Sequence, residues 1–150
     1  MSVRIPPIVQ VLVCGALGWG LALYFPDLRF CGSWGIMFAL VLFIAGVTLL
    51  ALALASFFQA KTTANPIDVS GAETLVTSGL FRLSRNPMYL GMLLILIGGV
   101  FWIGNWSAFL APAIFFWAMT ELQIKPEERA LKDKFGDAYI GYCQRTRRWI

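Results

Sequence analysis

The sequence contains no histidine and only three cysteines among its 150 residues. Cys14 falls inside an apolar run, Cys31 lies beyond the end of that run, and Cys143 lies close to the C-terminus. Because no two of these positions are suited to pairing, we expect no disulfide framework. Without histidine, and with the cysteines scattered, a metal site is not expected.

Charged residues are also scarce. They make up 13% of the chain, hydrophobic residues make up 59%, and the mean hydropathy is +0.73. A chain of this length cannot bury so much apolar surface in one small soluble core, so the composition favours a membrane protein. No repeat or inserted soluble segment divides it, and we interpret residues 1–150 as a single domain. No basic and aromatic pattern points to nucleic acid as a partner.

The common nucleotide and hydrolase motifs are absent as well. There is no Walker A sequence, no Gly-x-Ser-x-Gly elbow and no His-Glu-x-x-His motif. The stretch "GALGWG" at residues 15–20 loosely matches a glycine-rich motif, but it lies inside an apolar run with no preceding strand. Small residues for close helix packing explain it better.

Long apolar runs are what the chain has instead. A membrane-spanning helix needs roughly 20 apolar residues, and residues 8–25 and 34–58 each form an uncharged run. Residues 88–120 are too many for one helix and are interrupted by "GNW" at 104–106, which indicates a helical hairpin. We therefore predict an all-α, polytopic membrane helix bundle with about four transmembrane helices, the last two forming the hairpin, and a helical C-terminal tail.

The basic residues predict the orientation of this bundle. Four spans place the N-terminus, the linker 59–87 and the C-terminal tail on one side, and eleven of the twelve Lys and Arg residues fall there, with only Arg29 opposite. The positive-inside rule makes that side cytoplasmic, so both termini are expected in the cytoplasm. A cleavable signal peptide after Arg4 is an alternative, although the first run is long and no cleavage site follows it.

Two polar stretches flank the expected hairpin. They are "ETLVTSGLFRLSRNPMYLG" at 73–91 and "KPEERALKDKFGDAYIGY" at 125–142. Because a hairpin returns the chain to the side that it left, the two stretches are expected to lie near one another and to form a pocket at the cytoplasmic mouth of the bundle. The adjacent glutamates Glu127 and Glu128 point about 100° apart on a helix, so one of them is expected to face the bundle.

Both stretches also have an ordinary explanation. Asn86 suits the cap of the third helix and Pro87 its first turn, while Pro126 suits the start of a tail helix that ends at Gly136. A functional interpretation adds to this one. The free amides at a helix start attract an anionic group, and Arg85 can hold a carboxylate or phosphate by a forked contact.

The motifs "RNPMYLG" and "EER", followed by "FGDAYIGY", resemble those of the membrane methyltransferases that include isoprenylcysteine carboxyl methyltransferase and the phospholipid N-methyltransferases. Those enzymes carry an Arg-His-Pro-x-Tyr-x-Gly motif and a double glutamate, and they use S-adenosyl-L-methionine. The resemblance extends over residues 74–142, and the order and spacing of its motifs make it fairly specific.

This resemblance implies a set of site residues. Glu127 takes the position that binds the methionine part of the cofactor, and Arg85 lies at the mouth of the third helix. Glu128 is the nearby carboxylate that we nominate to accept a proton, which makes Arg85 and Glu128 the catalytic candidates. The implied cofactor contacts are Glu73, Thr74, Leu75, Val76, Phe81, Arg85, Asn86, Pro87, Tyr89 and Glu127.

Two departures from the family pattern bear on the methyl acceptor. Asn86 replaces the histidine of the eukaryotic prenylcysteine enzymes and cannot act as a general base. Gln123 replaces an arginine that resembles a clamp for a substrate carboxylate, which makes Gln123 the candidate for substrate binding. The sequence therefore predicts a lipid or small amphiphilic acceptor from the surrounding bilayer rather than a prenylated carboxylate.

Other classes of protein remain open at this point. An NADPH-dependent membrane reductase of related fold would need further basic contacts for the 2′-phosphate. A proton-coupled exporter would usually carry an ionisable residue inside a span, and the first two runs have none. A non-catalytic four-span protein would keep the motifs only as caps and anchors.

Overall fold

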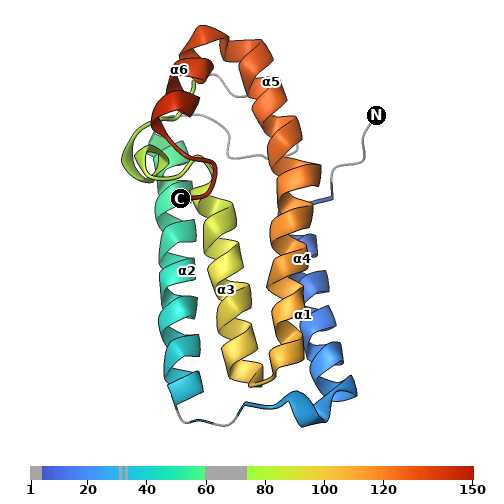
Figure 1. The fold of residues 1–150 in the computed structure, drawn as a ribbon. Helices are drawn as coiled ribbons and strands as arrows, with labels where there is room; N and C mark the ends of the chain where they lie inside the picture. The colour runs from blue at the N-terminus through green and yellow to red at the C-terminus, as the bar shows by residue number, and fades with distance from the viewer. Residues whose placement is uncertain (1–4, 31, 33, 60–73) are drawn as a thin grey trace.

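The computed structural model describes residues 5–30, 32, 34–59 and 74–150, and in these ranges the chain is helical, with no strand (Figure 1). Arg29 and Asn105 form an isolated antiparallel bridge. The α-helices are α1 Pro7–Tyr24, α2 Trp34–Gln59, α3 Pro87–Ile103, α4 Leu110–Ala118, α5 Lys125–Phe135 and α6 Asp137–Arg145. Short 3-10 helices occupy Pro26–Leu28, Gly79–Arg82 and Trp106–Phe109, and a π-helix occupies Met119–Ile124.

Three helical stretches are long and apolar enough to cross a membrane: Pro7–Tyr24, Trp34–Gln59 and Trp106–Phe135. The helix α3, Pro87–Ile103, is also apolar but has 17 residues. This all-helical fold is that of an integral membrane protein. The predicted helical class is confirmed, whereas the total of four spans and the cytoplasmic side of the termini stay predictions.

The third apolar run turns where the sequence is interrupted. Gly104 ends α3 in the left-handed region with φ 67°, which glycine adopts without strain. The Asn105 side chain then accepts a hydrogen bond from the backbone N–H of Ser107 at 2.9 Å, and its Nδ2 donates to the carbonyl oxygen of Phe25 at 2.8 Å. Asn105 therefore ties this turn to the end of α1, and we call this end of the bundle the turn end.

The tail helix α5 has Pro126 in its first turn and ends before Gly136, as predicted, but it does not begin as a separate helix. The helix runs from α4 through the π-helix Met119–Ile124 into α5, where Pro126 lies in the first turn. Proline has no N–H to donate, and its ring crowds the carbonyl group four residues earlier. The wider π-helical turn ahead of Pro126 accommodates both effects without ending the helix, and such turns are frequent at functional sites.

The helices α2 and α3 pack backbone to backbone through glycine. A Cβ on Gly46 would lie 2.6 Å from the carbonyl oxygen of Gly91, and a Cβ on Gly91 would lie 2.7 Å from that of Gly46. Neither position has room for a side chain, as is typical of helices that pack closely in membranes. In α1, a Cβ added to Gly18 would lie 3.1 Å from the Cβ of Ala111 of α4, so the packing role predicted for the 15–20 glycine stretch is confirmed at Gly18 but not at Gly20, which has no atom within 4 Å.

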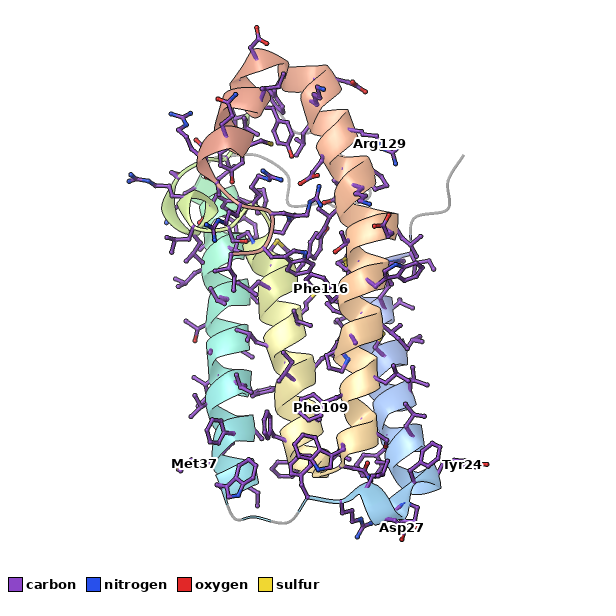
Figure 2. All side chains as sticks on the ribbon, in the orientation of Figure 1. Tyr24, Asp27, Met37, Phe109, Phe116 and Arg129 are labelled. Atoms are coloured by element: carbon purple, nitrogen blue, oxygen red, sulfur yellow. The ribbon has the colours of Figure 1, made fainter. Side chains whose placement is uncertain are left out.

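Side chains of different kinds gather at the two ends of the bundle. Figure 2 shows Asp27 and Met37 at the turn end and Arg129 at the opposite end, which we call the site end. At the site end α5 continues onward from α4, and α6 folds back toward the start of α3 (Figure 1). At the turn end aromatic rings pack together, and we call this group the aromatic cluster: Phe30, Trp34, Phe38, Phe101, Trp106 and Phe109.

Candidate active site

Arg85 lies just before α3 and is bonded to several distant parts of the chain. Its Nη1 donates to the carbonyl oxygens of Cys143 at 3.2 Å and Thr146 at 2.9 Å. Its Nη2 donates to Oε1 of Glu128 at 2.7 Å, and its backbone N–H donates to the carbonyl oxygen of Arg147 at 3.0 Å. The forked contact that the sequence suggested for a ligand is therefore made with acceptors of the chain itself.

Asn86 occupies the N-cap position of α3, but its side chain makes no capping hydrogen bond, so the predicted cap is wrong in this respect. Its Nδ2 donates instead to the carbonyl oxygen of Arg148 at 2.9 Å. The backbone N–H of Asn86 donates to Oγ of Ser84 at 3.1 Å. Pro87 begins α3 as predicted, at a position where its missing N–H is harmless. The Asn86 amide therefore fastens the C-terminal segment rather than the helix start.

Glu127 faces the bundle, as expected for one of the two glutamates. Its Oε1 accepts hydrogen bonds from the hydroxyl of Tyr89, at 2.8 Å, and from Nε2 of Gln123. Tyr89 is 5% exposed and Gln123 is 1% exposed, so both donors are fixed by burial. Gln123, which the sequence suggested for the acceptor, thus lies against the glutamate. Two neutral donors from α3 and the π-helix set the orientation of this carboxylate.

Glu128 points away from Glu127 and is shared by two arginines. Arg148 donates from Nε to Oε1 at 3.0 Å and from Nη2 to Oε2 at 2.6 Å, and Arg85 donates to Oε1 as well. The hydrogen bond with Glu128 raises the pKa of the Arg148 guanidinium above its ordinary value, so Arg148 stays charged. A carboxylate held in this way is better suited to fixing its partners than to accepting a proton.

This arrangement joins the "RNPMY" and "EE" motifs at one end of a membrane helix bundle. The sequence model of the phospholipid methyltransferase family matches residues 34–138, which include both motifs. The chain belongs to the phospholipid methyltransferase family.

Curated relatives agree with this family. Protein-S-isoprenylcysteine O-methyltransferase B of Arabidopsis thaliana is 31% identical over 124 residues, which cover 82% of this chain and 62% of the plant protein. A probable protein-S-isoprenylcysteine O-methyltransferase of Oryza sativa subsp. indica is 30% identical, with 83% and 65% covered. An uncharacterized protein of Haemophilus influenzae is 46% identical over 63 residues, its full length and 42% of this chain. No solved structure matches significantly.

The remaining predicted cofactor contacts lie on the segment that enters the site. Glu73 lies outside the described residues, Thr74 is exposed and Leu75 is half-buried. Val76 and Phe81 are buried in a cluster that also contains Ala53 of α2 and Tyr139 and Tyr142 of α6. The family's two motif regions therefore share one core at the site end.

Two buried tyrosines of α6 hold this segment in place. The hydroxyl of Tyr142 donates to the carbonyl oxygen of Phe81 at 2.6 Å. Burial raises the pKa of both the Tyr139 and the Tyr142 hydroxyl, so each stays protonated at neutral pH. The "FGDAYIGY" part of the family pattern thus holds the 74–81 segment through a hydrogen bond to the backbone of Phe81.

The sequence interpretation missed the C-terminal segment, residues 143–149. Its arginines were counted only as charges that set orientation, yet backbone carbonyls of this segment accept hydrogen bonds from Arg85 and Asn86. Its Trp149 stacks against Phe116 with ring centroids 4.8 Å apart and donates from Nε1 to Oγ1 of Thr120 at 3.3 Å. A large aromatic residue at the end of a charged tail was the signal that this segment docks on the bundle.

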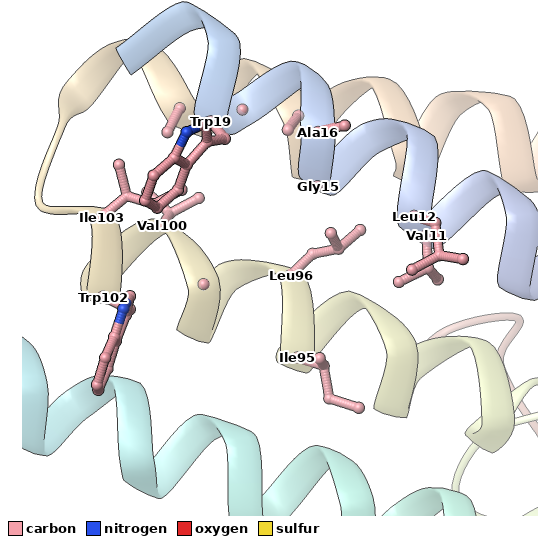
Figure 3. A pocket seen from close by; sticks show the side chains of 14 residues that line it. Val11, Leu12, Gly15, Ala16, Trp19, Ile95, Leu96, Val100, Trp102 and Ile103 are labelled. Carbon is pink, nitrogen blue, oxygen red and sulfur yellow. The ribbon is translucent and has the colours of Figure 1, made fainter. Parts of the chain in front are cut away.

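An apolar groove lies between α1, α3 and α4 (Figure 3), and its α3 lining residues lie closer to the turn end than Tyr89, the partner of Glu127. Its volume is about 390 Å³. Gly15 and Gly99 line it, and a Cβ added to Gly99 would meet no atom within 4 Å. Trp19 and Trp102 stand toward its turn end and are more than half exposed, at 56% and 64%. The groove is open, so hydrocarbon of a surrounding bilayer has access to it.

Proposed function

We propose that this protein is an S-adenosylmethionine-dependent integral membrane methyltransferase that acts on a lipid or small amphiphilic acceptor. The observation that carries the proposal is Glu127, held by Tyr89 and Gln123 where the family's two motifs meet. A fixed carboxylate suits the ammonium of the cofactor's methionine part. Membership of the phospholipid methyltransferase family and the plant relatives named as methyltransferases support the same activity.

The residues of the chain would contribute mainly by positioning. S-adenosylmethionine supplies a sulfonium that already activates the methyl group. Tyr89 and Gln123 orient Glu127, while Arg85, Glu128 and Arg148 join the start of α3 to α5. Fixing the reacting partners in a site that excludes water provides most of the acceleration expected of such a reaction.

The groove between α1, α3 and α4 supports an amphiphilic acceptor. Leu96 lines the groove and also belongs to the core cluster that contains Tyr89. The two residues are two turns apart on α3, about 10 Å along the helix axis. An acceptor with its head near Glu127 would therefore have space for an apolar chain below it, and this chain would enter sideways from the bilayer.

The reductase alternative finds less support. A nicotinamide cofactor with a 2′-phosphate calls for basic side chains that are available to an anion. Arg85 and Arg148, which lie at the site, both bind Glu128. The methyltransferase is therefore the function that the geometry supports best.

Binding of radiolabelled S-adenosylmethionine to the detergent-purified protein tests the proposal. We expect saturable binding that NADPH does not displace, and we expect Glu127→Gln to weaken it about 10-fold to 100-fold, since a charge-assisted contact contributes about 1.5–3 kcal/mol. The matched control is Glu121→Gln on the π-helix, because Glu121 pairs with Lys125 at the surface and should not affect binding. Absence of binding by the wild type, or displacement by NADPH, would overturn the proposal.

A further inference from the structure

We propose that the C-terminal segment, residues 143–149, is part of the active site and that Arg148 is a positioning residue for Glu127. Arg148 does this through Glu128, the neighbour of Glu127 on α5. The catalytic readout of this inference rests on the proposed methyltransferase function, whereas its structural readout does not.

Glu128 of α5 forms an ion pair with Arg148 of the C-terminal segment. Arg148 reaches back across 20 residues and makes a forked contact with both carboxylate oxygens, at 3.0 Å and 2.6 Å. The Glu128 side chain is 17% exposed and that of Arg85 13% exposed, so their ion pair is largely shielded from water, whereas the Arg148 side chain is 36% exposed at its edge. A forked contact of this kind fixes direction as well as distance. The position of α5 therefore depends on the C-terminal segment.

The backbone of the C-terminal segment accepts hydrogen bonds from Arg85 and Asn86. The carbonyl oxygens of Cys143, Thr146 and Arg147 accept from Arg85, and the carbonyl oxygen of Arg148 accepts from Asn86. These donors belong to the motif that starts α3, and in the described structure the segment supplies their acceptors. Displacing it would leave buried donors unpaired, which is costly for a charged group.

Beyond Arg148, Trp149 anchors the segment to α4 and to the π-helix. Trp149 packs on Phe116 of α4 and donates to Thr120 of the π-helix. The same π-helix contains Gln123, one of the two donors that orient Glu127. The segment therefore connects the start of α3, which precedes Tyr89, with the helix that carries Glu127. A change in Arg148 should move these two elements relative to one another without touching a ligand.

Arg148→Met tests this inference because it keeps an unbranched side chain and removes the forked charge. We expect the KM for S-adenosylmethionine to rise about tenfold, while kcat at saturation and the KM for the acceptor change little. Arg148→Lys should recover part of the affinity, since it restores the charge without the fork. Arg148→Met combined with Glu128→Gln should cost no more than the larger single effect. The matched control is Arg129→Met, which removes a charge from the exposed face of α5, where Arg129 Nε donates to the carbonyl oxygen of Lys125 at 3.4 Å.

Hydrogen exchange gives the structural readout. The amide of Arg85 donates to the carbonyl oxygen of Arg147, so Arg148→Met should speed exchange in the peptide around Arg85 and Arg129→Met should not. Unchanged exchange and unchanged cofactor affinity in a folded Arg148→Met variant would overturn the inference with the proposed function intact. If the wild type binds no S-adenosylmethionine, the proposed function fails, and the exchange experiment still decides the role of the segment. If Arg148→Met does not fold, the same comparison is made with Arg148→Lys, and wild-type affinity and exchange there overturn the inference.

Discussion

The two ends of the bundle are held together by different interactions. At the turn end the aromatic cluster packs ring on ring, with Phe101 in contact with the rings of Phe30, Trp34, Phe38 and Phe109. At the site end charged and polar groups from the start of α3, from α5 and from the C-terminal segment are joined by hydrogen bonds and ion pairs. Ring packing tolerates small shifts, whereas forked charge pairs and buried hydrogen bonds do not. The interactions at the site end therefore fix the positions of individual side chains, whereas those at the turn end hold the helices together.

The largest effect concerns which end faces which side of a membrane. Asp27 at the turn end and Asp133 on α5 are both exposed aspartates, so Asp27→Cys and Asp133→Cys form a matched pair. In a background without the three native cysteines, an impermeant thiol reagent should label Asp133→Cys only from the cytoplasmic side and Asp27→Cys only from the opposite side. The positive-inside rule motivates this expectation, and labelling of both from one face would refute it.

Removal of Arg85 should cause the largest loss of stability. Arg85→Leu takes one cation from Glu128 and leaves carbonyl oxygens of residues 143 and 146 without their donor. Removing one partner of a buried ion pair costs about 3–5 kcal/mol when the other charge is left unpaired, and the loss here should lie toward the low end because Glu128 keeps Arg148. Thermal unfolding in detergent should show a large drop in melting temperature together with loss of S-adenosylmethionine binding. A variant that melts like the wild type would show that the network at the site end contributes little.

Phe101→Ala applies the same experiment to the turn end. Each aromatic pair contributes about 0.5–1.5 kcal/mol beyond its buried area, and loss of several contacts should lower stability by about 1–3 kcal/mol. Since Phe101 lies far along α3 from the site end, cofactor affinity should stay at the wild-type value once the protein is folded. Phe58→Ala, at an exposed position that is 78% accessible, is the control for removal of a ring. Weaker cofactor binding in Phe101→Ala would show that the two ends are coupled.

The sequence was sufficient to predict the helices but not the network at the site end. Helices in an apolar medium must satisfy their own backbone groups, so uncharged runs such as 34–58 determine where helices form. The α2 bounds, Trp34–Gln59, differ from the predicted run by one residue. Helical periodicity also predicted that one of the two adjacent glutamates faces the bundle, and Glu127 is the one that does.

The missed features depend on contacts between residues far apart in the chain. Arg85 and Thr146 are separated by 61 residues, and no local pattern reports that a guanidinium will choose a carbonyl of the tail over a ligand. The continuous helix through Pro126 was missed because proline usually ends a helix, and a π-helical turn leaves no simple sequence signature. Tertiary packing overrode the local preference at both places.

The smallest expected effect concerns Tyr142 at the site end. Tyr142→Phe removes the hydroxyl that donates to the carbonyl oxygen of Phe81, which should cost about 0.5–1.5 kcal/mol at neutral pH. Burial raises the pKa of this hydroxyl above its value in the unfolded chain, about 10. The stabilisation is therefore complete below about pH 10 and falls as the pH rises further, because the unfolded state then loses its proton first. Melting temperatures should decline less steeply above about pH 10 in Tyr142→Phe than in the wild type, with a residual slope from Tyr139. Tyr24→Phe, at a position that is 79% exposed at the turn end, is the control for removal of a hydroxyl. An identical slope in Tyr142→Phe and the wild type would show that alkaline loss of stability arises elsewhere.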